Sequence, residues 1–196
     1  MKGIYIFLAE GFEDIEALAT ADVLRRGGVD VELVSLTEEP FEMSSHRVAV
    51  GVDQSFDYFA LHFDRAGTDE RDVMIFPGGM PGTRNLAQNS MLMDMMQEHY
   101  DDGGTVAAIC AAPGLVLGQL DGIAGKRVTC FDGFEGILEE AGAKFEPRPA
   151  ITDGRVITGR SAGHAVAFGL EILKKVKGEG KAAEVRHALM LDTLEA

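Results

Sequence analysis

Residues 105–114 read TVAAICAAPG: a short apolar run is followed by small residues that open a helix. The apolar run predicts a buried strand. Cys110 stands at the turn between the strand and the helix. A thiol at such a turn faces outward, and the amide groups of a helix N-terminus favour its thiolate. The segment therefore predicts a reactive cysteine, against the alternative that Cys110 is a small apolar residue packed in the core.

Apolar runs alternate with helical patterns along the rest of the chain. The predicted strands are Gly3–Ala9, Val29–Leu36, Asp72–Phe76, Thr105–Ile109 and Arg127–Phe131, with an extended piece at Val48–Val52 and a hairpin of Phe145–Ala150 with Arg155–Thr158 that turns at Asp153-Gly154. The predicted helices are Phe12–Arg26, Thr83–Gln88, Ser90–Tyr100, Gly133–Ala141, a long helix capped by Ser161, and Lys181–Leu191. The polar stretch Asp53–Arg71 is expected to be a loop. The alternation predicts an α/β fold, with a mostly parallel sheet and helices on both faces.

Length and composition limit the classes of function. The 196 residues fit one domain, residues 1–196, and an apolar fraction of 46% supports a substantial core. The formal charge of −14 argues against nucleic acid or an anionic membrane surface as partner. No signal pattern is visible, and no apolar stretch approaches the roughly 20 residues that span a bilayer. Because Cys110 and Cys130 are the only two cysteines, a reducing cytoplasm is the expected location.

Three predicted strands end in chemically distinct residues. The first is followed by residues 10–16 (EGFEDIE), the third by Pro77-Gly78-Gly79, and the next by Cys110. In a parallel sheet, ligands bind beyond the carboxyl ends of the strands, where the strand order reverses. An acidic helix start, a glycine turn and a thiol are therefore expected to converge on one rim.

Each of these groups has a functional and a structural interpretation. The amides of Gly78, Gly79 and Ala111 could form an oxyanion hole, or the glycines could simply make a turn. Glu16 could hold a proton and hydrogen-bond the sulfur, or it could be a solvated helix charge. Glu13 and Asp14 are rivals for the role of Glu16, although their positions suit the helix dipole better.

The histidines do not predict a metal site. They stand at positions 46, 62, 99, 164 and 187, with no His-x-x-x-His pattern and no cluster with the cysteines. We therefore expect no metal and no cofactor.

Four motifs in order give the chain a resemblance to the ThiJ/PfpI superfamily, nearest to the branch of the human Parkinsonism-associated protein deglycase. They are Glu10–Glu16, Phe76–Gly79 with Gly82–Leu86, Ala107–Pro113 and Gly159–Gly163. The resemblance covers nearly the whole chain. It implies a flavodoxin-like three-layer sandwich, usually a homodimer, with a reactive cysteine at a nucleophile elbow.

The resemblance also implies roles for individual residues. Cys110 matches the nucleophile and Glu16 the protonated acid beside it, while Gly79 and Ala111 offer backbone amides. Arg160 falls in a loop that often lines an anion pocket.

Two further positions are implied less directly. His46 or Arg47 falls where the family commonly has an arginine of the anion pocket. Cys130, near the same rim, is either a resolving thiol or a packed core residue.

Members of the family convert 2-oxoaldehydes such as methylglyoxal to hydroxy acids without glutathione, repair glycated groups, or sense oxidation with chaperone-like protection. Others carry a thiamine-biosynthesis label tied to a thiazole phosphate, or are called peptidases. The peptidase branch has a histidine directly after the nucleophile, and Ala111 at this position argues against a Cys–His protease. The deglycase branch often has a histidine on the next strand, where this chain has Phe131 or its neighbour, and His164 is a distant candidate.

The sequence therefore predicts a cysteine-dependent glyoxalase or deglycase that acts on small 2-oxoaldehydes or glycated groups. The main alternative is a non-enzymatic sensor whose ligand is an oxidant and whose reactive group is Cys110. A role related to thiazole monophosphate is a weaker alternative, motivated by the glycine turn and Arg160.

Overall fold

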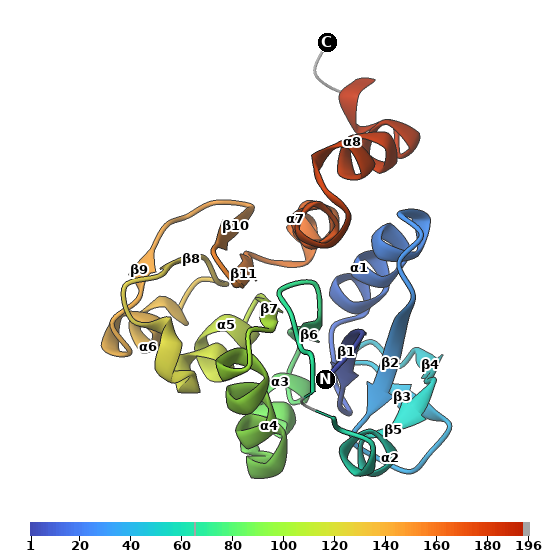
Figure 1. Ribbon diagram of the computed structural model, residues 1–196, viewed down its shortest axis with the longest axis vertical. Coiled ribbons are helices and arrows are strands. Elements are labelled where there is room, and N and C mark those ends of the chain that lie inside the picture. The colour runs from blue at the N-terminus through green and yellow to red at the C-terminus, as the bar shows by residue number, and fades with distance from the viewer. Residues whose placement is uncertain (65, 194–196) are drawn as a thin grey trace.

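A seven-stranded sheet forms the centre of the computed structural model, which describes residues 1–64 and 66–193 (Figure 1). The strand order is β10-β11-β7-β6-β1-β2-β5, and every neighbouring pair is parallel except β10 with β11. The strands are β1 (Ile4–Leu8), β2 (Val31–Ser35), β5 (Gln54–Ser55), β6 (Val73–Phe76), β7 (Thr105–Ile109), β10 (Ala150–Asp153) and β11 (Val156–Gly159). Two pairs stand outside this sheet: β3 (Phe41–Met43) with β4 (Ala49–Gly51), and β8 (Arg127–Val128) with β9 (Lys144–Phe145).

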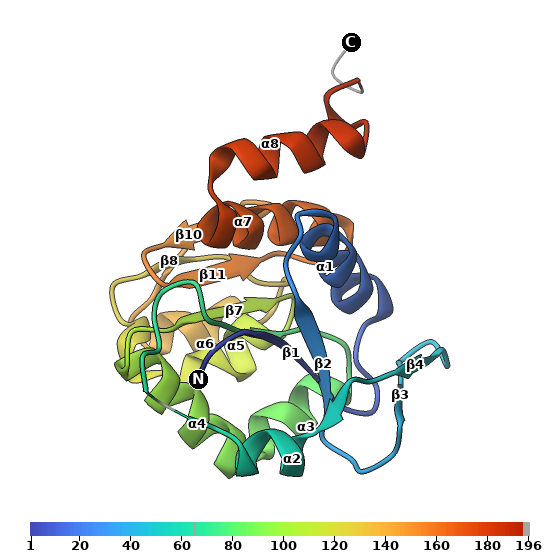
Figure 2. The same cartoon turned by 45° about the vertical axis from the view of Figure 1, so that its right-hand side comes forward.

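Helices cover both faces of the sheet (Figure 2). One face carries α1 (Asp14–Arg26) and α7 (Ala165–Lys177), with α8 (Glu179–Ala188) packed outside α7. The other face carries α2 (Phe56–Leu61), α3 (Gly82–Gln88), α4 (Ser90–Asp101), α5 (Ala112–Leu115) and α6 (Glu135–Glu140). Short 3₁₀ turns lie at Leu117–Gln119, Asp121–Ile123, Ala162–His164 and Leu191–Thr193.

The strand β1 shows why both faces must be covered. Ile4, Ile6 and Leu8 belong to the core beneath α1 and α7, whereas Phe7 packs in the opposite core and stacks on Phe76 with ring centroids 5.5 Å apart. Side chains alternate across a strand, so a strand that is apolar on both sides has to be buried on both sides. The predicted flavodoxin-like three-layer sandwich is confirmed.

Two of the predicted elements are wrong in extent. The expected strand Arg127–Phe131 is only β8, which pairs with β9 outside the central sheet. The hairpin turns at Asp153-Gly154 as predicted, but its first arm is β10, because the register pairs Ala150 with Gly159.

Two helices also differ from expectation: one was not predicted, and the other begins differently. The stretch expected to be a loop contains α2, whose first turn is capped where the Ser55 hydroxyl accepts a 3.3 Å hydrogen bond from the Tyr58 amide. Phe56 and Phe59, three residues apart, bury its inner face. Ser161 does not cap α7: its hydroxyl lies 2.9 Å from Nδ1 of His164, and a 3₁₀ turn precedes the helix.

The strand order sets the place of the candidate site. After β2 pairs on one side of β1, the chain crosses to β6 on the other side, so the order reverses at β1 and β6. The carboxyl ends of β1, β6 and β7 are therefore adjacent, as predicted. Within the described residues, none of the helices has the length and apolar character needed to cross a membrane.

A buried histidine beside Gly104 ties α4 to the sheet. His99 is fully buried, and its Nε2 lies 3.1 Å from the carbonyl oxygen of Asp72 and 3.0 Å from that of Thr105. Only a protonated nitrogen bonds to carbonyl oxygens, so Nε2 carries the hydrogen. Burial lowers the pKa of His99 to about 4, and the ring is neutral at pH 7.

Replacing Gly104 with alanine is expected to lower the free energy of unfolding by about 3 kcal/mol, because a methyl group there would lie 2.1–2.5 Å from three atoms of the His99 ring. The ring cannot move aside without losing its two hydrogen bonds. Gly136→Ala is the matched control, because a methyl group at that exposed position meets nothing within 4 Å. Denaturant unfolding of both variants tests the expectation, and equal stability of the two would contradict it.

Candidate active site around Cys110

Cys110 occupies a strained turn directly after β7. Its φ is 66°, in the left-handed region that non-glycine residues rarely adopt. Two backbone hydrogen bonds hold it there: its amide donates to the Gly159 carbonyl at 3.0 Å, and the Phe131 amide donates to its own carbonyl at 2.8 Å. A strained strand-to-helix turn that presents a side chain at the sheet edge is the geometry of a nucleophile elbow.

Glu16 lies beside the Cys110 thiol, on the first turn of α1. The Glu13 carboxylate caps this turn by accepting a 2.7 Å hydrogen bond from the Glu16 amide. The Glu16 side chain is 1% exposed, and its Oε2 accepts a 2.8 Å hydrogen bond from the Gly78 amide. A methyl group at Gly78 would lie 2.5 Å from Glu16 Oε2 and 2.6 Å from Cys110 Cβ, so glycine is required there.

Burial changes the proton affinity of both groups. It raises the pKa of Glu16 to about 7, against the opposing effect of hydrogen bonds with Cys110 and Gly78. Burial also raises the pKa of the Cys110 thiol, and the negative charge of Glu16 raises it further. A neutral Glu16 removes that second effect, so the thiolate is favoured when the carboxyl group holds the proton.

The backbone amides of Ala111 and Gly79 face the thiol and lower its pKa, although less than burial raises it. These two amides lie beside the sulfur, and the oxyanion hole that the sequence suggests for them stays a prediction. The amide of Gly78 is not free for this role, because it already donates to Glu16.

The helix after Cys110 is α5, which has only four residues. The amide of Ala111 at its start lowers the pKa of the thiol, in the direction that the sequence predicted. Burial and the negative charge of Glu16 outweigh this effect.

Arg160 directly follows β11 and comes one residue after Gly159, whose carbonyl accepts the hydrogen bond from the Cys110 amide. Its Nη2 donates to the Asp132 carboxylate, and its guanidinium carbon lies 5.8 Å from the centre of the Phe145 ring. Its Nη1 is buried and has no hydrogen-bond partner among the described residues. The side chain is thus on the predicted rim, where it forms an ion pair with Asp132.

His46 and Arg47, the other two residues of the expected anion pocket, lie in the loop between β3 and β4. His46 Nδ1 is hydrogen-bonded to Oδ2 of Asp14, so the ring faces a carboxylate rather than an anion site. Arg47 is exposed, with a φ of 65°. The structure therefore does not bring His46 together with Arg160 by any contact among the described residues.

Cys130 is fully buried, and burial raises the pKa of its thiol to about 12. A resolving thiol has to be accessible and to ionise easily. The packed-core alternative describes Cys130 better.

The residue next to Cys130 is the part of the rim that the sequence did not assign. Phe131 is bonded through its amide to Cys110 and leaves 46% of its surface exposed. No hydrophobic period in the sequence predicts this place for Phe131, because it depends on the hydrogen bond with Cys110, 21 residues away. His164, the distant candidate for a base, is bonded to Ser161 instead.

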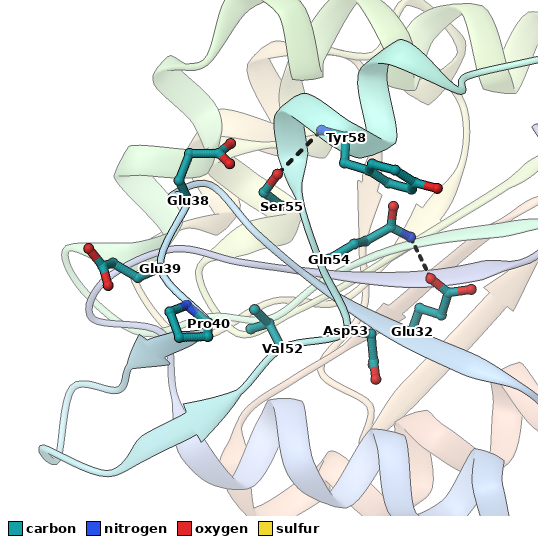
Figure 3. A pocket seen from close by; sticks show the side chains of 9 residues that line it. All are labelled: Glu32, Glu38, Glu39, Pro40, Val52, Asp53, Gln54, Ser55 and Tyr58. Atoms are coloured by element: carbon teal, nitrogen blue, oxygen red, sulfur yellow. Dashed lines mark hydrogen bonds between the residues drawn. The ribbon is translucent and has the colours of Figure 1, made fainter.

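A surface hollow of about 520 Å³ lies away from Cys110, between the β2–β3 connection and the start of α2 (Figure 3). Its walls carry the four carboxylates of Glu32, Glu38, Glu39 and Asp53. The lining includes neither thiol nor imidazole, so we base the candidate chemistry on the Cys110 rim.

Comparison with known proteins shows similarity along nearly the whole chain. The sequence profile of the DJ-1/PfpI family matches residues 2–175. Protein dj-1beta of Drosophila melanogaster is 31% identical over 190 residues, which cover 97% of each chain. The crystal structure of Drosophila melanogaster DJ-1beta superposes with a TM-score of 0.85 at 30% identity, covering 96% of this chain and 97% of that one.

A third relative carries an activity in its name. Glutathione-independent glyoxalase DJR-1.2 of Caenorhabditis elegans is 31% identical over 182 residues, which cover 93% of this chain and 92% of the relative.

Proposed function

Since the chain belongs to the DJ-1/PfpI family, we propose that it is a cysteine-dependent, glutathione-independent glyoxalase for small 2-oxoaldehydes. The observation that carries the proposal is the pairing of Cys110, on a strained elbow, with a buried Glu16 whose pKa is about 7. A carboxyl group with this pKa gives and takes a proton readily near neutral pH. The activity named for the Caenorhabditis elegans relative supports the same chemistry.

The first half of the reaction forms a covalent adduct. The Glu16 carboxylate accepts the thiol proton, and the Cys110 sulfur attacks the aldehyde carbon of methylglyoxal to give a hemithioacetal. The amides of Gly79 and Ala111 bind the oxyanion that develops on the aldehyde oxygen. The proton held by Glu16 then neutralises this oxygen.

The second half moves a hydrogen and releases the product. The Glu16 carboxylate removes the proton from the former aldehyde carbon to give an enediolate, and returns it to the neighbouring carbon. The hydroxyl proton of the former aldehyde carbon passes to the oxygen of that neighbouring carbon. The adduct is then a thioester of lactate, which water hydrolyses to lactate and free Cys110 thiol. The carbon that was an aldehyde is oxidised and its ketone neighbour is reduced, so no external oxidant or reductant is needed.

Incubation of the purified protein with methylglyoxal, in buffer without glutathione or metal, tests the proposal. Lactate should accumulate in proportion to the enzyme, as measured by chiral chromatography. Equal formation of lactate with and without protein would overturn the glyoxalase proposal.

The second candidate function is oxidation sensing by Cys110, favoured by the difference between the two thiols. Cys110 is half-buried next to Glu16, which can accept its proton or hydrogen-bond its oxidised form, whereas Cys130 is fully buried. Mild peroxide should add two oxygen atoms to the Cys110 peptide and leave the Cys130 peptide unmodified, as measured by mass spectrometry. Preferential oxidation of Cys130 would rule out this function.

A further inference from the structure

Three metal-ligating side chains from two distant segments meet at the start of α1. Glu13 and Asp14 open the helix, and His46 comes from the loop between β3 and β4. One ligand atom of each residue lies within 4.8 Å of those of the other two. Tetrahedral ligands at 2.0–2.2 Å from one ion are about 3.3–3.6 Å apart, so side-chain rotations would have to close the set around the ion.

Backbone contacts hold the two segments against each other. Phe12 and Ser44 form a β-bridge, and the Ser45 amide donates a 2.8 Å hydrogen bond to the Phe12 carbonyl. The Ser44 hydroxyl donates to Oδ1 of Asp14, which orients this carboxylate toward His46. The three ligands are therefore positioned by the fold rather than by chance contact of long side chains.

An ion would use the atoms that now bond within the cluster. Oε2 of Glu13 is occupied by the Glu16 amide, which leaves the other carboxylate oxygen for a ligand bond. Oδ2 of Asp14 and Nδ1 of His46 are hydrogen-bonded to each other at 2.5 Å, so an ion would replace the proton between them and move them apart. The helix dipole places about half a positive charge here, which the two carboxylates outweigh.

We propose that Glu13, Asp14 and His46 bind one divalent first-row transition-metal ion such as Zn²⁺, with water in the remaining coordination positions. One imidazole nitrogen and two carboxylate oxygens suit Zn²⁺, Mn²⁺ or Fe²⁺, whereas Mg²⁺ prefers oxygen ligands alone. The site does not depend on the glyoxalase proposal. The local spacing of histidines and cysteines predicted no metal site, because His46 and Asp14 are 32 residues apart in the sequence.

Isothermal titration of the EDTA-treated full chain with Zn²⁺ at pH 7.5 tests the site. Wild type should bind one ion per chain, and His46→Gln and Asp14→Asn should each weaken the Kd at least tenfold. Thermal melts check that the variants are folded, and the exposed position of His46 makes its replacement the safer of the two.

Two variants control for other ligands. His187→Gln removes a comparable exposed histidine, whose Nδ1 lies 3.6 Å from Asp192, and should leave the Kd unchanged. Cys110→Ser should also leave it unchanged, and bound Co²⁺ should show no thiolate absorption band. No saturable binding by wild type, equal Kd values for wild type and His46→Gln, or loss of binding in Cys110→Ser would each overturn the proposal.

Discussion

Cys110→Ala is expected to lower kcat/KM for methylglyoxal at least 100-fold. The proposed reaction begins with a carbon–sulfur bond, and no other described thiol can replace Cys110, because Cys130 is fully buried. The loss should appear mainly in kcat, since the nucleophile acts after the substrate is bound. Steady-state measurement of lactate formation checks the expectation.

Cys130→Ala is the matched control for this variant. It removes the same atoms from the other cysteine, in the core rather than on the rim, and should keep the wild-type kcat/KM. Full activity of Cys110→Ala would exclude a covalent mechanism. Equal losses in the two variants would instead point to a general effect of removing sulfur from the fold.

The buried strands and the meeting of their ends could be predicted from the sequence. β1, β6 and β7 are nearly continuous apolar runs because the sheet is covered on both faces, and this pattern is local. The rule that ligands bind at the carboxyl ends of parallel strands then placed Glu16, Gly79 and Cys110 on one rim.

The chemistry of individual groups could not be predicted in the same way. The pKa of a group depends on its burial and on neighbours that are distant in sequence, such as Gly78 and Cys110 for Glu16. The length of α5 and the pairing of Arg160 with Asp132 are further examples, because both depend on how the connections pack.

Glu16→Gln is expected to abolish most turnover and at the same time stabilise the protein at pH 8. Glutamine can still accept the hydrogen bond from the Gly78 amide but cannot carry a proton between the substrate carbons, which is worth 10²–10⁴-fold in typical enzymes. We therefore expect kcat to fall at least about 100-fold. A variant that is both inactive and more stable separates loss of chemistry from loss of fold.

The stabilisation follows from the raised pKa. The pKa of Glu16 is about 7 in the folded protein and about 4.5 in the unfolded chain, so the folded state holds the proton more tightly. The contribution of this proton to stability is fully present below pH 4.5 and is lost as the pH rises through 7. The difference between the two pKa values corresponds to about 3 kcal/mol of stability that wild type loses at pH 8 and Glu16→Gln does not. The unpaired amide group of the buried glutamine offsets about 1 kcal/mol of this gain. The variant should therefore be about 2 kcal/mol more stable at pH 8 and no more stable than wild type at pH 5.

Urea unfolding of wild type and Glu16→Gln at the two pH values checks this. Glu38→Gln is the control, because it removes the same charge from an exposed position and should show no such dependence on pH. Lower stability of Glu16→Gln at pH 8 would mean that the ionised carboxylate is held favourably, and Glu16 could not then serve as the proton carrier near neutral pH. A gain at pH 8 that disappears at pH 5 would instead show that the fold keeps a costly buried carboxyl group beside Cys110, as proton transfer at that thiol requires.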